Sequence, residues 1–373
     1  MVQRHAAERQ GYVPREQCVI GAKVQGVKMK KYFRGILCLA ALMVAASASG
    51  AEWTRVAGGP GTECSHGTPY AFFVHAGRPD RLLVYFQGGG ACWSGATCDP
   101  HARSYKPGIR PGSRPKFNGH NKPAGIFDLA DPRNPVGDYT MVYVTYCTAD
   151  TFLGDRIHSY QVPDGDTVRI HHAGHANAMA ALRWVYKHVR SPETVLVTGE
   201  SAGAEAAAFY AGPIADHYPH ARIVQLPVSL GAFGSWPVPA VWGVADLVER
   251  AAGHSSEITQ NAFIAAAAAR SNIVPAIYDT VDDDVQLHFL RLFDPSITAV
   301  APVLARTRAQ LRAEVPRVHT YTAPGSRHTI LAFPDFYTLQ VNGVRFRDWL
   351  ANLLNGQAMP DVVCNACLPV AGK

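Results

Sequence analysis

Short apolar runs alternate with helix-like segments along most of this chain of 373 residues, and this alternation limits the fold more than any other feature. The predicted strands are the apolar runs 81–86, 140–144, 194–198, 223–228 and 317–322. Between them, apolar residues recur at intervals of three and four, as on one face of a helix. The predicted helices are 174–189, 202–211, 261–269 and a terminal helix near 336–354. Helices between buried strands imply a mostly parallel central sheet with helices on both faces.

The first 51 residues have the pattern of a targeting segment. Lys30 and Lys31 precede an apolar stretch at 36–46, and small residues end at Ala51, which is typical of a secretory signal. We expect 1–28 to be an over-extended gene start, with a structured arm as the alternative, and 29–51 to be the signal peptide. The mature protein, 52–373, is then secreted or periplasmic. One α/β domain with cap-like loop insertions accounts for its length.

Charge and hydropathy exclude two kinds of partner. Residues 1–51 contain eight basic and two acidic side chains, which accounts for the whole net charge of +6. Because the remainder is neutral, we expect no nucleic-acid partner. No apolar run is long enough to span a bilayer, so we expect no stable membrane insertion.

Cysteine usage agrees with export. Six of the eight cysteines lie after the predicted signal peptide, and an even number in an oxidising compartment predicts disulfides. The short loop between Cys92 and Cys98 is the pairing that the sequence favours. Cys364 and Cys367 lack the second close pair of ligands that zinc needs, so we interpret them as a structural bridge and expect no metal site.

A Gly-x-Ser-x-Gly motif carries the candidate nucleophile. Gly199, Ser201 and Gly203 lie between a predicted strand and a predicted helix of small residues. This context is typical of the nucleophile elbow of an α/β-hydrolase-like fold, where the serine occupies a strained turn. The alternative is a glycine-rich turn that holds a buried serine.

A glycine run at 88–90 follows an earlier predicted strand. Acyl transfer creates an oxyanion that needs backbone N–H donors, and glycines let the main chain approach closely. Gly89 and Gly90, with Ala202 after the nucleophile, are the candidate oxyanion hole. The glycine spacing does not favour a phosphate loop, whereas a plain tight turn remains an alternative.

The base and the acid should follow the serine in the order acid, then histidine. We select His328, because it lies on a loop directly after the strand at 317–322, where an imidazole can reach Ser201. The acid lies in a segment with four candidate carboxylates, among which composition does not choose. These are Asp279, Asp282, Asp283 and Asp284.

Taken together, these motifs resemble the pectin acetylesterase family, which includes the Notum carboxylesterases. The resemblance rests on 88–93, on Tyr146-Cys147 with Phe152 and Gly154-Asp155, on 199–203, on the Asp-Asp-Val-Gln segment and on 325–328. It implies that Asp283, three residues before Gln286, is the triad acid, with Asp284 in reserve. It also implies a catalytic domain over 52–373 and no cofactor. Ala91 stands where plant members usually have Trp, which leaves the substrate open.

The sequence therefore predicts a secreted serine carboxylesterase that hydrolyses acetyl or short acyl esters on a polysaccharide or another ester substrate. A secreted polyester depolymerase or lipase with the same triad is the first alternative. A non-catalytic binding domain on a hydrolase scaffold is an alternative of another class.

Overall fold

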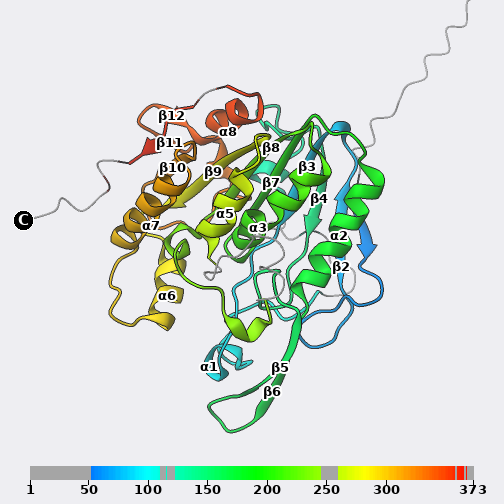
Figure 1. The fold of residues 1–373 in the computed structure, drawn as a ribbon, viewed down its shortest axis with the longest axis vertical. Helices are drawn as coiled ribbons and strands as arrows, with labels where there is room; N and C mark the ends of the chain where they lie inside the picture. Colours follow the sequence, from blue (N-terminus) through cyan, green and yellow to red (C-terminus); the bar gives the residue numbers. More distant parts are fainter. Residues whose placement is uncertain are drawn as a thin grey trace, which may run out of the picture. The chain divides into compact units, whose positions relative to one another are not determined.

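A nine-stranded sheet forms the centre of the molecule, in the strand order β1-β2-β4-β3-β7-β8-β9-β10-β13 (Figure 1). The pairs β1–β2 and β2–β4 are antiparallel, and the other neighbours are parallel. The mostly parallel sheet that the sequence predicts is confirmed. The strands are β1 (Thr54–Ala57), β2 (Ala71–His75), β3 (Arg78–Phe86), β4 (Tyr139–Val144), β7 (Thr194–Glu200), β8 (Arg222–Val228), β9 (Ile273–Thr280), β10 (His319–Ala323) and β13 (Val362–Val363).

This computed structural model describes residues 52–109, 115, 122–244, 259–357, 359–364 and 367, all within one compact unit, 48–373. The predicted gene start, 1–28, and the predicted signal peptide, 29–51, lie outside the described residues. Within the described ranges, no helix is both long and apolar enough to cross a membrane.

Both faces of the sheet are buried, because successive strand side chains point in opposite directions. Leu82, Val84 and Phe86 pack into one apolar cluster, while Leu83 and Tyr85 pack into another. The first cluster lies under helices α2 (Gly174–His188), α3 (Ala202–His217), α5 (Gln260–Ala268) and the end of α7 (Val300–Glu314). The second cluster lies under α8 (Phe346–Leu354) and the short 3-10 turns η1 (Gly125–Phe127) and η4 (Pro334–Tyr337). Helices on both faces are confirmed.

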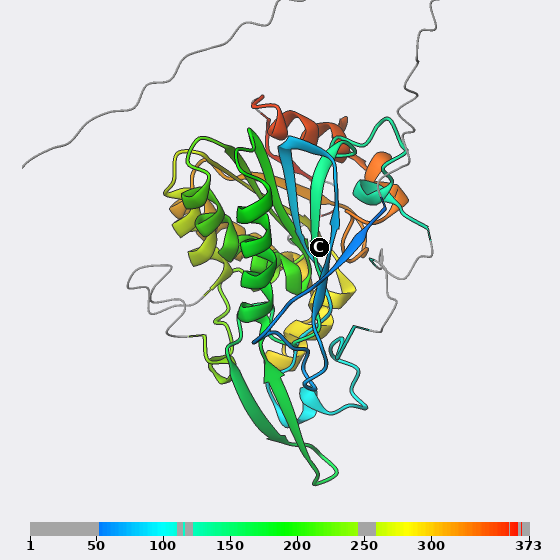
Figure 2. The same cartoon turned by 90° about the vertical axis from the view of Figure 1, so that its right-hand side faces the viewer.

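Insertions follow the carboxyl ends of several strands. Helix α1 (Gly95–Cys98), the antiparallel hairpin β5 (Arg156–Gln161) and β6 (Thr167–His172), and helix α6 (Asp284–Phe293) lie at one end of the sheet, and the hairpin projects beyond it (Figures 1 and 2). Loops of this kind at the carboxyl ends of parallel strands are where α/β proteins build their sites.

Three disulfides join the six cysteines that follow the predicted signal peptide. Cys92 pairs with Cys98, as predicted, and Cys364 pairs with Cys367. The third bridge, between Cys64 and Cys147, joins residues 83 apart in the sequence and fixes the segment before β2 to the end of β4. The expectation of a disulfide-bonded protein is confirmed.

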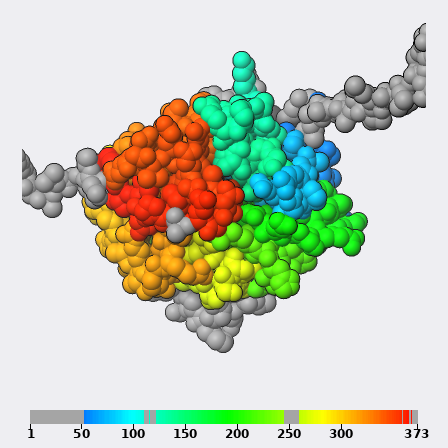
Figure 3. Space-filling view, turned by 90° about the horizontal axis from the view of Figure 1, so that it is seen from above, coloured from blue at the N-terminus to red at the C-terminus, as the bar shows by residue number. Residues whose placement is uncertain are grey.

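The predicted terminal helix near 336–354 is wrong in its first half. Residues 334–345 form η4 and a two-stranded hairpin, β11 (Gln340–Val341) and β12 (Val344–Arg345), and only α8 is helical. Asn342 and Gly343 have φ of 49° and 80°, and an Asn-Gly pair with positive φ selects a tight hairpin. Tyr337 donates to the carbonyl of Gly125 at 2.7 Å, so this segment lies beside the turn at 125–127, as the space-filling view also shows (Figure 3).

Candidate active site

Ser201 occupies the sharp turn between β7 and α3, with φ of 55° and ψ of −126°. A residue other than glycine is strained at positive φ, and such strain gathers at functional sites. A Cβ on Gly199 would overlap the carbonyl of Gly203, and one on Gly203 would overlap the carbonyl of Phe86. The two glycines are therefore required for β7, α3 and β3 to approach one another around the serine.

Glu200, the residue before the serine, joins this turn to the loop after β10. Its Oε1 accepts hydrogen bonds from the amides of Ile330 and Leu331 at 3.1 and 2.7 Å, and its Oε2 accepts from the Tyr85 hydroxyl at 2.7 Å. Sequence reasoning missed this role, because the motif leaves the position before Ser201 unspecified. A buried carboxylate with three donors fixes the loop that carries His328.

His328 and Asp283 contact each other directly. The Nδ1 atom of His328 lies 2.9 Å from Oδ1 and 2.8 Å from Oδ2 of Asp283. Asp283 is fully buried and caps α6, with Oδ1 accepting from the amides of Val285 and Gln286. A further hydrogen bond joins Oδ2 to the side-chain amide of Gln286 at 3.1 Å.

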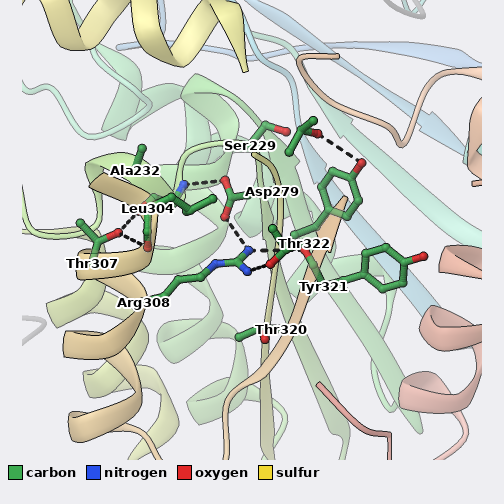
Figure 4. Close-up of polar contacts among 12 residues, drawn as sticks. Ser229, Ala232, Asp279, Leu304, Thr307, Arg308, Thr320, Tyr321 and Thr322 are labelled. Atoms are coloured by element: carbon green, nitrogen blue, oxygen red, sulfur yellow. Dashed lines mark hydrogen bonds and ion pairs between the residues drawn. The ribbon is translucent and has the colours of Figure 1, made fainter. Parts of the chain in front are cut away.

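The other three acids of the segment lie elsewhere. Asp282 and Asp284 are exposed. Asp279 is fully buried, but its Oδ2 pairs with Arg308 at 3.1 Å and its Oδ1 accepts from the amide of Gly231 at 2.8 Å (Figure 4). Burial raises the pKa of Asp279, while Arg308 opposes that shift. This second buried acid thus belongs to a network that joins β9, α7 and the residues after β8.

The predicted residues meet at one end of the sheet. Ser201 follows β7, Asp283 follows β9 and His328 follows β10, and these strands run parallel. Ser201 and His328 line the same pocket. The Nε2 atom of His328 is buried and has no hydrogen-bond partner among the described residues, so this nitrogen is available to a proton from the pocket.

The candidate oxyanion donors lie beside the serine. Gly90 and Ala202 line the pocket with Ser201, and a side chain on Gly88 would overlap the carbonyl of Glu200. Within the described ranges, the amides of Gly89 and Gly90 donate to no protein acceptor. The N–H of Ala202 is at the first position of α3, where a helix leaves its amides without partners. Gly89 itself lies against the Tyr146 ring rather than on the pocket wall.

The pocket opens to solvent and is lined mainly by apolar side chains. Trp93 stacks on Phe293 with their rings 4.3 Å apart, and Phe293 also contacts Trp236. Its aromatic walls are Trp93, Phe233, Trp236, Trp242, Phe289 and Phe293. An apolar pocket with a few convergent polar groups is the usual form of a small-molecule site.

A family profile for pectinacetylesterases matches residues 47–236, about half of the chain. The chain belongs to the pectinacetylesterase family. Members of this family are carboxylesterases, so the enzyme class follows from the match. The pectinacetylesterase match includes Ser201 and the glycines at 88–90, and it ends before Asp283 and His328. No curated protein matches the chain.

Proposed function

We propose that this chain is a secreted serine carboxylesterase that removes acetyl or other short acyl groups from a polysaccharide. Ser201 is the nucleophile, His328 the general base and Asp283 the acid that orients it. The mature catalytic domain is 52–373, exported to the periplasm or beyond after loss of the signal peptide at 29–51. One observation supports the triad: the Nδ1 atom of His328 contacts Asp283, while its Nε2 atom, in the pocket of Ser201, has no partner among the described residues.

The first half-reaction forms an acyl-enzyme. The Asp283 carboxylate accepts from Nδ1–H of His328, which leaves the Nε2 lone pair to take the Ser201 proton. The Ser201 oxygen attacks the ester carbonyl carbon, and the carbonyl electrons move to oxygen. Amides of Gly90 and Ala202, which line the pocket, stabilise that oxyanion, with the amide of Gly89 as the third predicted donor, at about a hundredfold or more in kcat per donor. Collapse expels the alcohol, which takes its proton from His328.

The second half-reaction releases the acid. His328 takes a proton from a water molecule, whose oxygen attacks the acyl carbonyl, and the same amides hold the new oxyanion. Collapse breaks the bond to Ser201, whose oxygen recovers a proton from His328. The proposed cycle uses side chains and backbone amides of the chain, together with one water molecule.

Labelling with a fluorophosphonate probe, followed by an acetyl-release assay on acetylated pectin and acetylated xylan, tests this proposal. The wild-type protein should form an adduct at Ser201 and release acetate, and Ser201→Ala should lose both, because no other group supplies the nucleophile. A folded wild-type protein with no adduct would instead favour a non-catalytic binding domain. Turnover by Ser201→Ala near the wild-type rate would remove Ser201 from its role.

The pocket supports a second candidate function, a secreted polyester depolymerase or lipase with the same triad. An acetyl group has two carbons, whereas the pocket is lined by six aromatic side chains. Apolar walls of this kind stabilise longer acyl groups through buried area. Clearing of a polyester or lipid emulsion, with little acetate released from the polysaccharides, would support this candidate over the first.

A further inference from the structure

Glu205 is a buried acid that the proposed mechanism does not use. It lies on α3, four residues after Ser201, and lines the same pocket. Glu205 is only 6 % exposed, and its Oε1 atom has no hydrogen-bond partner among the described residues. The neighbouring residues of α3, Ala204 and Ala206 to Ala208, are all small, apolar and buried. An apolar side chain would therefore suit this position better if packing were its sole purpose.

Thr151 is a second buried polar residue that the proposed mechanism does not use. It also lines the pocket, and its Oγ1 is buried without a hydrogen-bond partner among the described residues. Its backbone amide is fixed by the hydroxyl of Tyr146 at 3.0 Å. Buried polar atoms are normally hydrogen-bonded in proteins. Two buried polar atoms on one apolar pocket, Oε1 of Glu205 and Oγ1 of Thr151, thus have no partner in the described part of the chain, which points to a ligand that supplies their hydrogen bonds.

The charge of Glu205 decides what that ligand is. Burial is the cause that raises its pKa to about 8, and within the described ranges no cation pairs with it. Among the described residues that line the pocket, the other titratable side chain is that of His328. At neutral pH the carboxyl is therefore mainly protonated, and it can both donate and accept a hydrogen bond. Such a group suits an uncharged oxygen rather than an ammonium ion.

We infer that Glu205, with Thr151, binds an uncharged oxygen on the acyl chain of the substrate, either a hydroxyl or a second ester carbonyl. Glu205 lies four positions after Ser201, the N-cap of α3, which is about 6 Å along the axis, and helical side chains lean toward the N-terminus. The oxygen therefore lies a few carbons from the carbonyl that Ser201 attacks. Esters of hydroxyalkanoic acids, single or linked in oligomers, have this chemistry. The inference rests on the proposed function, because it assumes that Ser201 is acylated.

Three p-nitrophenyl esters of one chain length test the inference: the butyrate, the 3-hydroxybutyrate and the 3-acetoxybutyrate. The readout is the kcat/KM of each oxygenated ester divided by that of the butyrate. Glu205→Leu should lower this ratio by about tenfold or more, because the site loses a hydrogen bond that the butyrate never makes. Glu205→Gln keeps a donor and an acceptor and should stay within about threefold of wild type. A loss with the hydroxy ester alone identifies a free hydroxyl, and a loss with the acetoxy ester alone identifies an ester carbonyl.

Thr151→Val provides a second variant in case Glu205→Leu fails to fold, and it should lower the same ratio. Fluorophosphonate labelling of each variant reports whether Ser201 remains reactive. Equal ratios in wild type and in the labelled variants would overturn the inference while the esterase proposal stands. A wild-type protein that hydrolyses none of the three esters and forms no adduct would overturn both.

Discussion

Asp283 and Glu205 are both buried acids near the pocket, but their hydrogen-bonding surroundings differ. Asp283, at the start of α6, accepts hydrogen bonds from two backbone amides, from Gln286 and from His328. Glu205, on α3, has a carboxyl oxygen with no partner in the described part of the chain. Both residues are buried. Burial alone therefore does not define what an acid does, because the donors around it decide whether it is held as an orienting group or left to meet a ligand.

The contrast extends to the neighbours of each acid. Gln286 donates to both Asp279 and Asp283, and Asp279 pairs with Arg308, so the acid at the start of α6 is part of a wider network. Around Glu205, the helix offers small apolar residues, and the pocket wall is aromatic. The hydrogen-bonded surroundings of Asp283 are typical of a side chain with a fixed geometry. The apolar surroundings of Glu205 are typical of a specificity pocket.

The largest expected effect on kcat comes from replacing Asp283. Asp283→Asn should lower kcat by about 10⁴-fold, because the amide no longer fixes the tautomer in which His328 accepts at Nε2. Acetate or p-nitrophenol release measures the change. Asp284→Asn is the matched control, since Asp284 is exposed at the next position and should change kcat by less than about twofold. The reverse ranking of the two variants would move the acid by one position.

Glu205, the acid buried in apolar surroundings, should make the folded state less stable as the pH rises. With a pKa of about 8, folded Glu205 is mainly protonated below that pH, whereas in the unfolded chain it ionises around its ordinary pKa of 4.5. The unfolded state therefore binds fewer protons across this window, and the free energy of unfolding falls as pH increases. Between these two pKa values, Glu205 lowers the free energy of unfolding by an amount on the order of a few kcal/mol.

Glu205→Gln isolates that contribution, because the amide does not titrate. Urea unfolding at about pH 5 and about pH 8 should show a smaller loss of stability in the variant than in wild type. Burial also raises the pKa of Asp150 to about 7, but this group is present in both proteins and cancels in the comparison. Parallel pH dependences in the two proteins would show that Glu205 is ionised in the folded state.

The smallest effect is expected from Gln286, whose side chain donates to both Asp279 and Asp283. Gln286→Leu removes one donor from Asp283 and the acceptor for the amide of Ala232, so kcat should fall by about tenfold. Gln286 also lines the pocket, so two substrates are compared. A positioning role lowers kcat/KM for p-nitrophenyl acetate and butyrate by the same factor, whereas unequal factors would assign Gln286 to acyl-chain binding.

Much of the fold could be predicted because its signals are local. The apolar runs at 81–86 and 194–198 lie within β3 and β7, and the helix predicted at 174–189 matches α2 to within one residue. The strand β9 was not predicted, since Pro275 and Asp279 interrupt its apolar pattern. The terminal helix was too long, because Asn342-Gly343 forms a hairpin turn inside a segment whose apolar spacing also fits a helix.

Local patterns in the chain were enough to predict the strands at 81–86 and 194–198, the glycine-flanked Ser201 between a strand and a helix, and the short Cys92–Cys98 bridge. Each of these depends on residues within a few positions of one another. The tertiary structure decided which acid contacts His328, what Glu200 holds and where Glu205 lies. Those partners are 45 residues apart for Asp283 and His328 and 131 apart for Glu200 and Leu331. Hydrogen bonds over such separations form only when the parallel sheet brings the carboxyl ends of its strands together, and no local pattern records them.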